Sequence, residues 1–422
     1  MTFNKFSEWI RNFQTLSPNS TIYLCFWIFG LINNILYVVI LSAAIDIVDT
    51  DIPKSLVLLV DILPSLTIKL LSPFFIQRIR YGYRIILLII LSCVGMILVS
   101  LKDLWICLLG VGLASLSSGF GEVTFLQLTH MYKEISLNGW SSGTGGAGLF
   151  GSAVYWLVTT VLHIPIHISL LLFSILPFGF LLYFRLGTYV EYQALPNPEI
   201  TTIDIEAPEL EPELGVFIGD HSNEESISSH VLETLAKLKV LVVPYMLPLT
   251  TVYFFEYLIN QAVSPTLLFP IATPDENSMS HLSLFHKYRD YYVTYSILYQ
   301  IGVFISRSTA HSFRVKKLYI LSFLQAINLF IVLLQSTNYI VHQPWSIMVL
   351  IVYEGLLGGS SYVNTFLNVL SNVRPQDREF ALGSVSIADS LGILLAALVG
   401  MKLEPTLCQH QINNNRPWCT LD

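Results

Sequence analysis

Long apolar segments recur along the whole chain and are separated by short polar stretches. Most of these segments reach the ~20 residues that an α-helix needs to cross the hydrocarbon core of a bilayer. The expected spans are residues 21–44, 54–76, 84–101, 104–129, 143–162, 166–185, 237–260, 290–308, 317–336, 345–369 and 381–403. This pattern predicts an all-α, polytopic membrane protein with about eleven transmembrane helices.

The composition excludes the common soluble classes of protein. Of the 422 residues, 53% are hydrophobic and only 12% are charged, and the mean hydropathy is +0.62. Soluble domains carry roughly 25% charged residues because their surfaces face water, whereas lipid-facing helices need no polar surface. No basic patch with interleaved aromatic residues indicates a nucleic-acid partner. We therefore expect a protein embedded in the lipid bilayer and not a soluble enzyme.

Basic residues gather in alternate loops, which predicts the orientation of the chain. With a cytosolic N-terminus, the cytosolic segments hold Lys5, Arg11, Arg78, Arg80, Arg84, Lys133, Arg185, Lys237, Lys239, Arg307, Arg314, Lys316, Lys317, Arg374 and Arg378. The opposite loops are poor in both residue types, and the longest of them, 261–290, carries only Lys287 and Arg289. An odd number of spans then places the C-terminus on the luminal side.

One long acidic segment divides the chain. Residues 186–236 contain eleven Asp or Glu residues, four prolines and no Lys or Arg. Such a composition cannot bury a core, so we interpret the segment as a disordered cytosolic linker, on which a cytosolic partner can dock. The expected domains are a six-helix half at 1–185, this linker, and a five-helix half with a luminal tail at 237–422.

Weak internal echoes suggest that the two halves are related. Residues 124–126 read TFL in span four, and the same letters recur at 365–367 in span ten, six spans later. A basic loop follows span two, and another follows span eight. Echoes of this kind are typical of transporters built from repeats. The layout is that of the major facilitator superfamily with one terminal helix missing, although chance can produce matches this short.

Span two carries the clearest polar stripe. Asp61, Ser65, Lys69 and Ser72 lie at positions i, i+4, i+8 and i+11, which places them on one face of a helix. Asp61 and Lys69 are two turns apart, too far for direct pairing along the helix. A charged group at mid-bilayer costs about 2.5–3.5 kcal/mol on insertion scales. We expect Lys69 to meet either an anionic ligand or an acid on another helix, which would be a structural ion pair.

Other carboxyl groups also fall inside expected spans. Glu122 follows SSGFG in span four, where small residues allow helices to approach closely. A carboxyl group in such a place can exchange a proton, as a proton-coupled carrier requires, or remain a neutral structural group. Glu256 in span seven, Glu354 in span ten and Asp389 in span eleven are further candidates. For these three, helix packing or a water-exposed helix end explains the residue equally well.

Uncharged polar and aromatic residues complete the candidate pathway. Span one contains Asn33 and Asn34, for which hydrogen bonding between packed helices is the simplest role. Span eight opens with a tyrosine stripe whose deeper members, Tyr295 and Tyr299, can line a cavity. Arg307 ends this span on the cytosolic side, as a gate or as an orientation charge. The candidate substrate and ion pathway is Asp61, Lys69, Glu122, Glu256, Tyr295, Tyr299, Arg307, Glu354 and Asn34.

The glycine-rich segment 140–148, WSSGTGGAG, is expected to form the loop between spans four and five. No Lys follows the glycines and no strand precedes them, so the segment is not a phosphate-binding P-loop. Gly143, Gly146 and Gly151 are expected to allow tight packing of span five, with a role in gating as the alternative.

The remaining chemistry indicates neither a metal site nor a cofactor. His163 and His167 bracket Pro165, which disfavours the helix that an i, i+4 metal pair needs, and no Cys-x-x-Cys pair occurs. Cys408 and Cys419 lie in the expected luminal tail, where they can form a disulfide or remain free.

Several long motifs resemble the battenin family, the Batten-disease proteins and their fungal relatives. The matching segments are GLINNILYVVILSAA at 30–44, DILP at 61–64 with Lys69, WSSGTGGAG at 140–148, EYLINQ at 256–261, LYQIGVF at 298–304, Arg307, YEGLLGG at 353–359, Asn364 and Asp389. They occur in order across nearly every span. The short linker resembles that of a fungal member.

The resemblance implies a major-facilitator-like fold in the vacuolar or lysosomal membrane and a role in vacuolar pH homeostasis. In fungi it implies transport of basic amino acids such as arginine, and in animals clearance of glycerophosphodiesters. Composition and spacing show none of this.

We therefore expect a vacuolar secondary transporter that moves a small solute, with protons as a possible partner, by alternating access between its two halves. The alternative is a non-transporting scaffold that regulates trafficking or proton-pump activity through its acidic linker. A membrane-embedded enzyme ranks last, since no Gly-x-Ser-x-Gly, His-x-x-x-Asp or zinc motif is present.

Overall fold

The computed structural model describes residues 17–47, 54–101, 103–186, 227–271, 285, 287–310 and 312–420, and within these ranges every regular element is helical. The N-terminal elements are α2 (Pro18–Ile47), α3 (Lys54–Phe75), η1 (Ile76–Arg78), α4 (Tyr81–Val99), α5 (Leu104–Trp156), η2 (Leu157–Val161), α6 (Ile166–Phe173) and η3 (Leu176–Leu182). The C-terminal elements are α8 (Ile227–Leu241), η4 (Val242–Met246), α9 (Leu247–Leu258), η5 (Ile259–Val263), η6 (Ser264–Thr266), α10 (Tyr288–Ser308), α11 (Leu318–Asn338), α12 (Pro344–Asn372), η7 (Pro375–Asp377), α13 (Arg378–Val385), α14 (Ile387–Asn413) and η8 (Pro417–Thr420).

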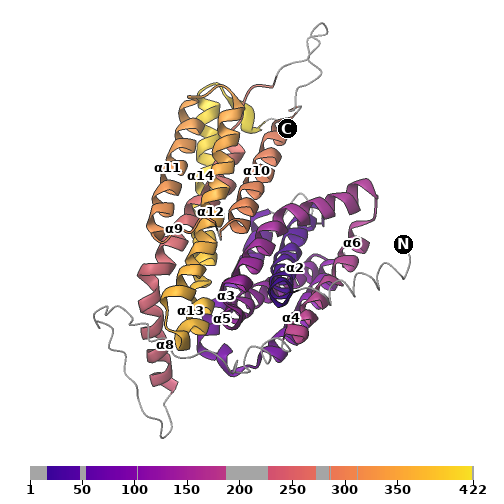
Figure 1. The fold of residues 1–422 in the computed structure, drawn as a ribbon. Helices are drawn as coiled ribbons and strands as arrows, with labels where there is room; N and C mark the ends of the chain where they lie inside the picture. The colour runs from indigo at the N-terminus through magenta and orange to yellow at the C-terminus, as the bar shows by residue number, and fades with distance from the viewer. Residues whose placement is uncertain are drawn as a thin grey trace, which may run out of the picture.

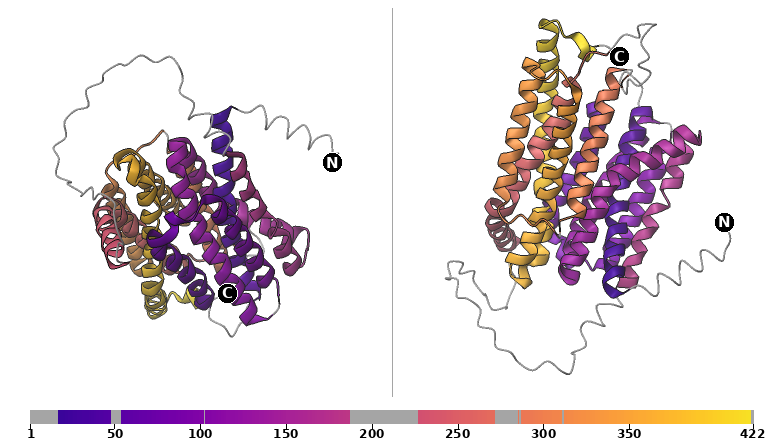
Figure 2. Two further views of the ribbon diagram at one scale, coloured as in Figure 1. Left: turned by 90° about the horizontal axis from the view of Figure 1, so that it is seen from below. Right: turned by 45° about the horizontal axis from the view of Figure 1, so that its top comes forward.

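The helices form two groups that stand side by side (Figure 1). The elements up to η3 make the N-terminal half, and those from α8 onward make the C-terminal half. Two other viewing directions show the same division (Figure 2). The halves meet mainly where α3 and α5 pack against α10, α12, α13 and α14. This arrangement confirms the expected two-half, major-facilitator-like bundle.

The eleven expected spans all coincide with helical segments. In the part of the chain that the structure describes, eight helices are long and apolar enough to cross a membrane by length and composition. One of these is α5, which contains two of the expected spans, whereas α10 is not among them. The tyrosines and other polar residues of α10 lower its mean hydropathy.

Helix α5 differs from the sequence expectation in its middle. The glycine-rich segment 140–148 was expected to be a loop, but it lies inside the helix. The chain turns instead at Lys133, whose φ of 58° and ψ of −153° interrupt the helical backbone. The prediction failed because glycines and serines signal turns in water, whereas between membrane helices the same small residues permit close packing.

That close packing is visible at Gly143, where α5 meets α2. A Cβ atom added to Gly143 would overlap the backbone of Trp27. Gly355 plays the same part between α12 and α10, because a Cβ there would overlap the backbone of Tyr299. These glycines let two helix pairs approach closely, which is how membrane helices gain packing energy without a hydrophobic effect between them.

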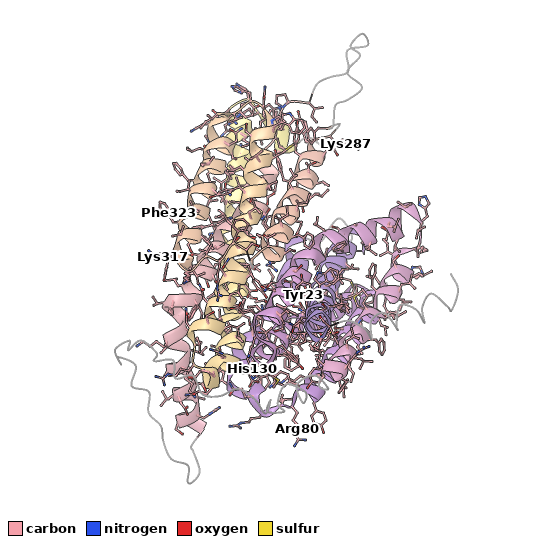
Figure 3. The ribbon with its side chains drawn as sticks, in the orientation of Figure 1. Tyr23, Arg80, His130, Lys287, Lys317 and Phe323 are labelled. Carbon is pink, nitrogen blue, oxygen red and sulfur yellow. A yellow bond between two sulfur atoms is a disulfide. The ribbon has the colours of Figure 1, made fainter. Side chains whose placement is uncertain are left out.

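The ends of the bundle differ in the contacts that join the two halves. Figure 3 places Arg80 and His130 toward one end and Lys287 toward the other. At the end with Arg80, Tyr81 Oη donates to Glu379 Oε1 at 2.7 Å, and Arg84 approaches the same carboxylate at 4.0 Å. Arg314 Nη1 also pairs with Glu134 Oε1 at 2.9 Å. We call these contacts the basic-end contacts; all three cross between the halves.

Two segments bear on the expected domain boundaries. Most of the acidic linker, 187–226, lies outside the described residues, but helix α8 already begins at Ile227, ten residues before the expected start of the C-terminal half. At the other end, α14 continues to Asn413, and a disulfide joins Cys408 to Cys419 in η8. The segment expected as a tail is therefore helical and cross-linked to itself.

Candidate functional site

A polar cavity of about 130 Å³ lies between the two halves. We call it the central cavity. Its walls come from seven helices of both halves. The lining residues are Asn34, Asp61, Ile62, Ser65, Lys69, Ser115, Ser118 and Glu122 from the N-terminal half, and Tyr253, Tyr257, Arg307, Tyr362, Asp389, Ser390 and Ile393 from the C-terminal half. Polar and charged groups gathered inside an oily bundle indicate a place that water or a solute enters.

Lys69 joins the halves at this cavity. Its Nζ lies 2.6 Å from Glu122 Oε2 on α5, and 3.1 Å from Asp389 Oδ1 on α14. It also donates to Ser390 Oγ at 2.8 Å. Lys69 is only 2% exposed. One ammonium group therefore compensates two carboxylates, one from each half, so the pairing to Asp389 depends on how the halves sit together.

Helix α3, which carries Lys69, contains a proline beside the cavity-lining residue Ser65. Pro64 has no N–H group and interrupts the helix ladder. Beside it, Ser65 N donates to Ser115 Oγ at 3.2 Å, and the Ser115 hydroxyl donates to the carbonyl of Asp61. The hydroxyl of α5 thus replaces the i to i−4 bond of α3, a common device where a membrane helix bends at proline.

Arg307 faces the cavity from α10. Its Nη1 donates to Thr144 Oγ1 at 2.8 Å, and its Nη2 donates to Tyr253 Oη at 2.9 Å. The guanidinium carbon lies 4.2 Å above the ring of Tyr362. Within the described part of the chain, no carboxylate oxygen lies within 4 Å of Arg307. Its charge is held by neutral partners, which leaves it suited to a carboxylate or phosphate of a solute.

Tyr362 links the two charged groups into one network. Its Oη donates to Glu122 Oε1 at 2.8 Å and accepts from Trp140 Nε1 at 3.0 Å. The same ring lies under Arg307. A continuous chain of contacts therefore runs from Asp389 through Lys69, Glu122 and Tyr362 to Arg307. Such a network can pass a change at one charge to the other across the interface between the halves.

Two further candidate carboxyl groups lie inside the C-terminal half and do not line the cavity. Glu256 is 2% exposed, and it accepts a hydrogen bond from the hydroxyl of Tyr299. Glu354 is fully buried and accepts from Asn260 Nδ2 at 3.0 Å, while the same amide donates to the carbonyl of Glu256 at 3.2 Å. Neither carboxyl group is exposed at the surface of the protein.

The candidates selected from the sequence fall into three places. The central cavity contains Asn34, Asp61, Lys69, Glu122 and Arg307. Glu256, Tyr299 and Glu354 lie together in the C-terminal half. Tyr295 does not line the central cavity: it is buried, and its Oη donates to the carbonyl of Leu267 at 2.9 Å.

Sequence reasoning left several cavity residues out of the candidate pathway. Tyr253 and Tyr257 flank Glu256 in the aromatic run of span seven, and Tyr362 follows Glu354 by eight residues on α12. Asp389 was weighed as a candidate but not included, because helix packing or a water-exposed helix end explained it equally well. Only the pairing with Lys69 from α3 reveals its place.

Comparison with known proteins gives the evolutionary relationship of the chain. A profile of the CLN3 protein family matches residues 24–410. The chain belongs to the CLN3, or battenin, family. Protein BTN1 of Saccharomyces cerevisiae is 60% identical over 95% of this chain and 98% of its own length. Protein BTN1 of Candida glabrata is 57% identical over 96% and 100%, and protein btn-1 of Neurospora crassa is 40% identical over 96% and 92%.

A solved structure supports the fold of this battenin-family chain. A bacterial homologue of the iron transporter ferroportin, crystallised in an outward-facing state, aligns with a TM-score of 0.53 over 96% of both chains. The sequence identity is 11%, so the likeness concerns the fold alone. Together, family and fold confirm the resemblance and the major-facilitator-like architecture inferred from the sequence.

Proposed function

We propose that this battenin-family protein is a secondary transporter of the vacuolar membrane that moves a small charged solute by alternating access. The observation that carries the proposal is the central cavity, whose charged network is divided between two packed halves. A scaffold needs no such polar interior, and burying these charges without a use would cost several kcal/mol.

The arrangement of charge favours a solute that carries both signs or one strong charge. Arg307 supplies a guanidinium without a carboxylate partner in the described residues, so it suits a carboxylate or a phosphodiester. Asp61, Glu122 and Asp389 supply negative charge for a cationic group. Basic amino acids such as arginine and glycerophosphodiesters both meet one or both requirements. Transport of either would also connect the protein to vacuolar pH homeostasis if a proton moves with it.

The cluster around Lys69 suggests how the halves alternate. Lys69 and Glu122 belong to the same half, so their pairing survives a rocking motion, whereas Asp389 and Ser390 move with the other half. Separation of α14 from α3 exposes Asp389 without its ammonium partner. A proton or the cationic group of the solute then compensates that carboxylate, which makes the conformational change depend on what occupies the cavity.

Solute flux in proteoliposomes tests the proposal. Purified protein is reconstituted into liposomes, and counterflow of labelled arginine and of glycerophosphocholine is measured against protein-free liposomes. We expect exchange of at least one solute, and at least a tenfold loss in Lys69→Ala. If both solutes stay at the protein-free rate, or if Lys69→Ala transports at the wild-type rate, the proposed site is wrong.

Deleting residues 196–226, which end before α8 begins, separates the transporter from the scaffold alternative. A carrier retains most of its flux without this acidic segment, because the segment supplies none of the cavity residues. A scaffold that recruits partners through the segment would lose its function in cells while the helix bundle stays intact.

A further inference from the structure

A second polar layer lies inside the C-terminal half, between helices α9, α11 and α12. It contains Glu256 and Glu354, which are 2% and 0% exposed and are linked by Asn260. One oxygen of each carboxyl group, Oε2, has no hydrogen-bond partner among the described residues. We call this region the C-terminal carboxyl layer.

Helix α11 presents two amides to the same level. Gln325 and Asn328 are 0% and 1% exposed, and none of their four side-chain polar atoms has a hydrogen-bond partner in the part of the chain that the structure describes. Buried amides without protein partners are rare in folded proteins, so these polar atoms are available to a ligand.

The register between α9 and α11 places these amides beside the carboxyls. Thr251 of α9 bonds to Ser322 of α11 at 3.0 Å, and Thr266, farther along the same chain segment, bonds to Ser336 at 2.7 Å. Glu256 lies one third of the way along the chain from Thr251 to Thr266. The point one third of the way from Ser322 to Ser336 on α11 falls between Gln325 and Asn328.

Apolar layers above and below confirm this register. Val252, Leu321 and Leu357 pack together on one side of the layer. Leu329 of α11 and Ile351 of α12 belong to one apolar cluster on the other side. Moving one turn from the first layer toward the second reaches Glu256 on α9, Gln325 on α11 and Glu354 on α12, each on the same face as its apolar neighbour.

No ion pair among the described residues balances the carboxyl groups of this layer directly. Across the described ranges, no Lys or Arg nitrogen lies within 4 Å of either Glu256 or Glu354. Tyr299 of α10 donates to Glu256, and Tyr253 and Tyr257 flank it on α9. The nearby cation, Arg307, is engaged by Thr144 and Tyr253, and Asp389 of α14 is engaged by Lys69. Two adjacent carboxylates in such a setting require a positive charge between them.

We propose that the C-terminal carboxyl layer binds one small monovalent cation, a proton or Na⁺, through Glu256, Glu354 and the amide oxygens of α11. Oxygen ligands of this kind suit small hard cations. The layer touches the central cavity through α9, since Tyr253 and Tyr257 line that cavity on either side of Glu256. The role of this layer in coupling transport to a cation rests on the proposed function. Its ability to bind a cation does not depend on that function.

Carbodiimide labelling tests the site without any knowledge of the solute. Dicyclohexylcarbodiimide is apolar and reacts with protonated carboxyl groups, so it reports occupancy by a proton. The full-length protein in lipid nanodiscs is labelled at acid and alkaline pH, with NaCl or with choline chloride, and modified residues are located by peptide mass spectrometry. Labelling of Glu256 or Glu354 that falls at alkaline pH indicates a proton site. Protection by NaCl but not by choline chloride indicates a Na⁺ site.

Variants show whether the layer acts as a unit. We expect Glu354→Gln to remove the dependence of Glu256 labelling on pH or NaCl, and Asn328→Leu to weaken it. Glu404→Gln makes the same chemical change at an exposed position of α14 and should leave the dependence intact. The inference is overturned if neither carboxyl is labelled in the folded protein although both are labelled in SDS, or if labelling ignores both pH and NaCl.

Flux separates this inference from the proposed function. In proteoliposomes, Glu354→Gln should lower the accumulation driven by a proton or Na⁺ gradient at least tenfold more than it lowers counterflow exchange. Gradient-driven accumulation that is unchanged in Glu354→Gln would refute the coupling role while leaving the transporter proposal standing. Absence of flux in the wild type, with labelling as expected, would refute the transporter proposal and leave the cation site.

Discussion

Lys69 forms ion pairs with two carboxylates of the site, Glu122 and Asp389. It lies between carboxylates from both halves and is almost fully removed from solvent. Removing one partner of a buried pair is far more costly than never having had the pair, because an uncompensated charge remains. Substitutions at this position therefore affect stability as well as transport.

Replacing Lys69 by Met should lower the free energy of unfolding by about 3–5 kcal/mol, because Glu122 and Asp389 lose their shared ammonium. Adding Asp389→Asn should recover part of that loss. The measurement is thermal unfolding of the detergent-solubilised protein, with Lys402→Met as the exposed control. An equal unfolding temperature for Lys69→Met and wild type would show that Lys69 is not buried among carboxylates.

Replacing Arg307 by Lys should raise KM for the transported solute about tenfold, or about 1.4 kcal/mol. Lysine keeps the charge but cannot span Thr144 and Tyr253 while stacking on Tyr362, as the planar guanidinium does. Initial uptake rates over a range of solute concentrations give KM and the maximal rate separately. A KM equal to that of the wild type would show that the fork of Arg307 does not bind the solute.

For single residues, the sequence predicts which charged groups are buried in helices. It does not predict which of these groups contact one another. The stripe of Asp61 and Lys69 on α3 is visible as periodicity, and the cost of a buried charge predicts a partner for Lys69. Nothing in the spacing says that the partners are Glu122 and Asp389, since the latter is 320 residues away in the chain. Tyr362 is equally hidden, because a tyrosine in an apolar helix has no distinctive pattern.

Among the elements, the contact between α2 and α5 gives the clearest prediction. Gly143→Ala should destabilise the protein by about 1–3 kcal/mol, because the new methyl group overlaps the backbone of Trp27 and forces the helices apart. Gly82→Ala is the matched control, since a Cβ there meets only the side chain of Phe184 at 3.7 Å. Thermal unfolding of both variants in detergent should separate them; equal unfolding temperatures would contradict the close approach at Gly143.

The helices themselves follow from hydrophobic length, and the exceptions have physical causes. All eleven apolar runs became helical because a bilayer leaves backbone groups no other partner. The turn between the two spans of α5 was predicted at residues 140–148 instead of at Lys133. Glycine and serine favour loops in soluble proteins, whereas in membrane proteins they allow close contacts between helices. The helical continuation of α14 beyond residue 403 was missed because its sequence is polar and carries Pro405.

For the whole molecule, the disulfide between Cys408 and Cys419 bears on orientation. A C-terminus in an oxidising lumen should carry this bond, whereas a cytosolic one should not. In intact vacuoles, we expect these two cysteines to react with a maleimide–polyethylene glycol reagent only after denaturation and reduction. Reaction without a reductant would contradict the luminal placement. Loss of the bond in Cys408→Ser should cost about 3 kcal/mol of stability, measured as a lower unfolding temperature.

The account as a whole holds that the two halves move against each other during transport. The basic-end contacts between Tyr81 and Glu379 and between Glu134 and Arg314 close one end of the interface in this structure. If alternating access is correct, these contacts must open in every cycle.

Reversible cross-linking of the halves tests this claim most directly. Tyr81→Cys and Glu379→Cys are combined in a protein whose three free cysteines, Cys25, Cys93 and Cys107, are replaced by alanine. A short thiol-reactive bridge is added in proteoliposomes, with each single-cysteine variant as the control. The account predicts that solute exchange falls at least tenfold on cross-linking and returns on reduction. Exchange that continues at the full rate while the halves are locked together would contradict it.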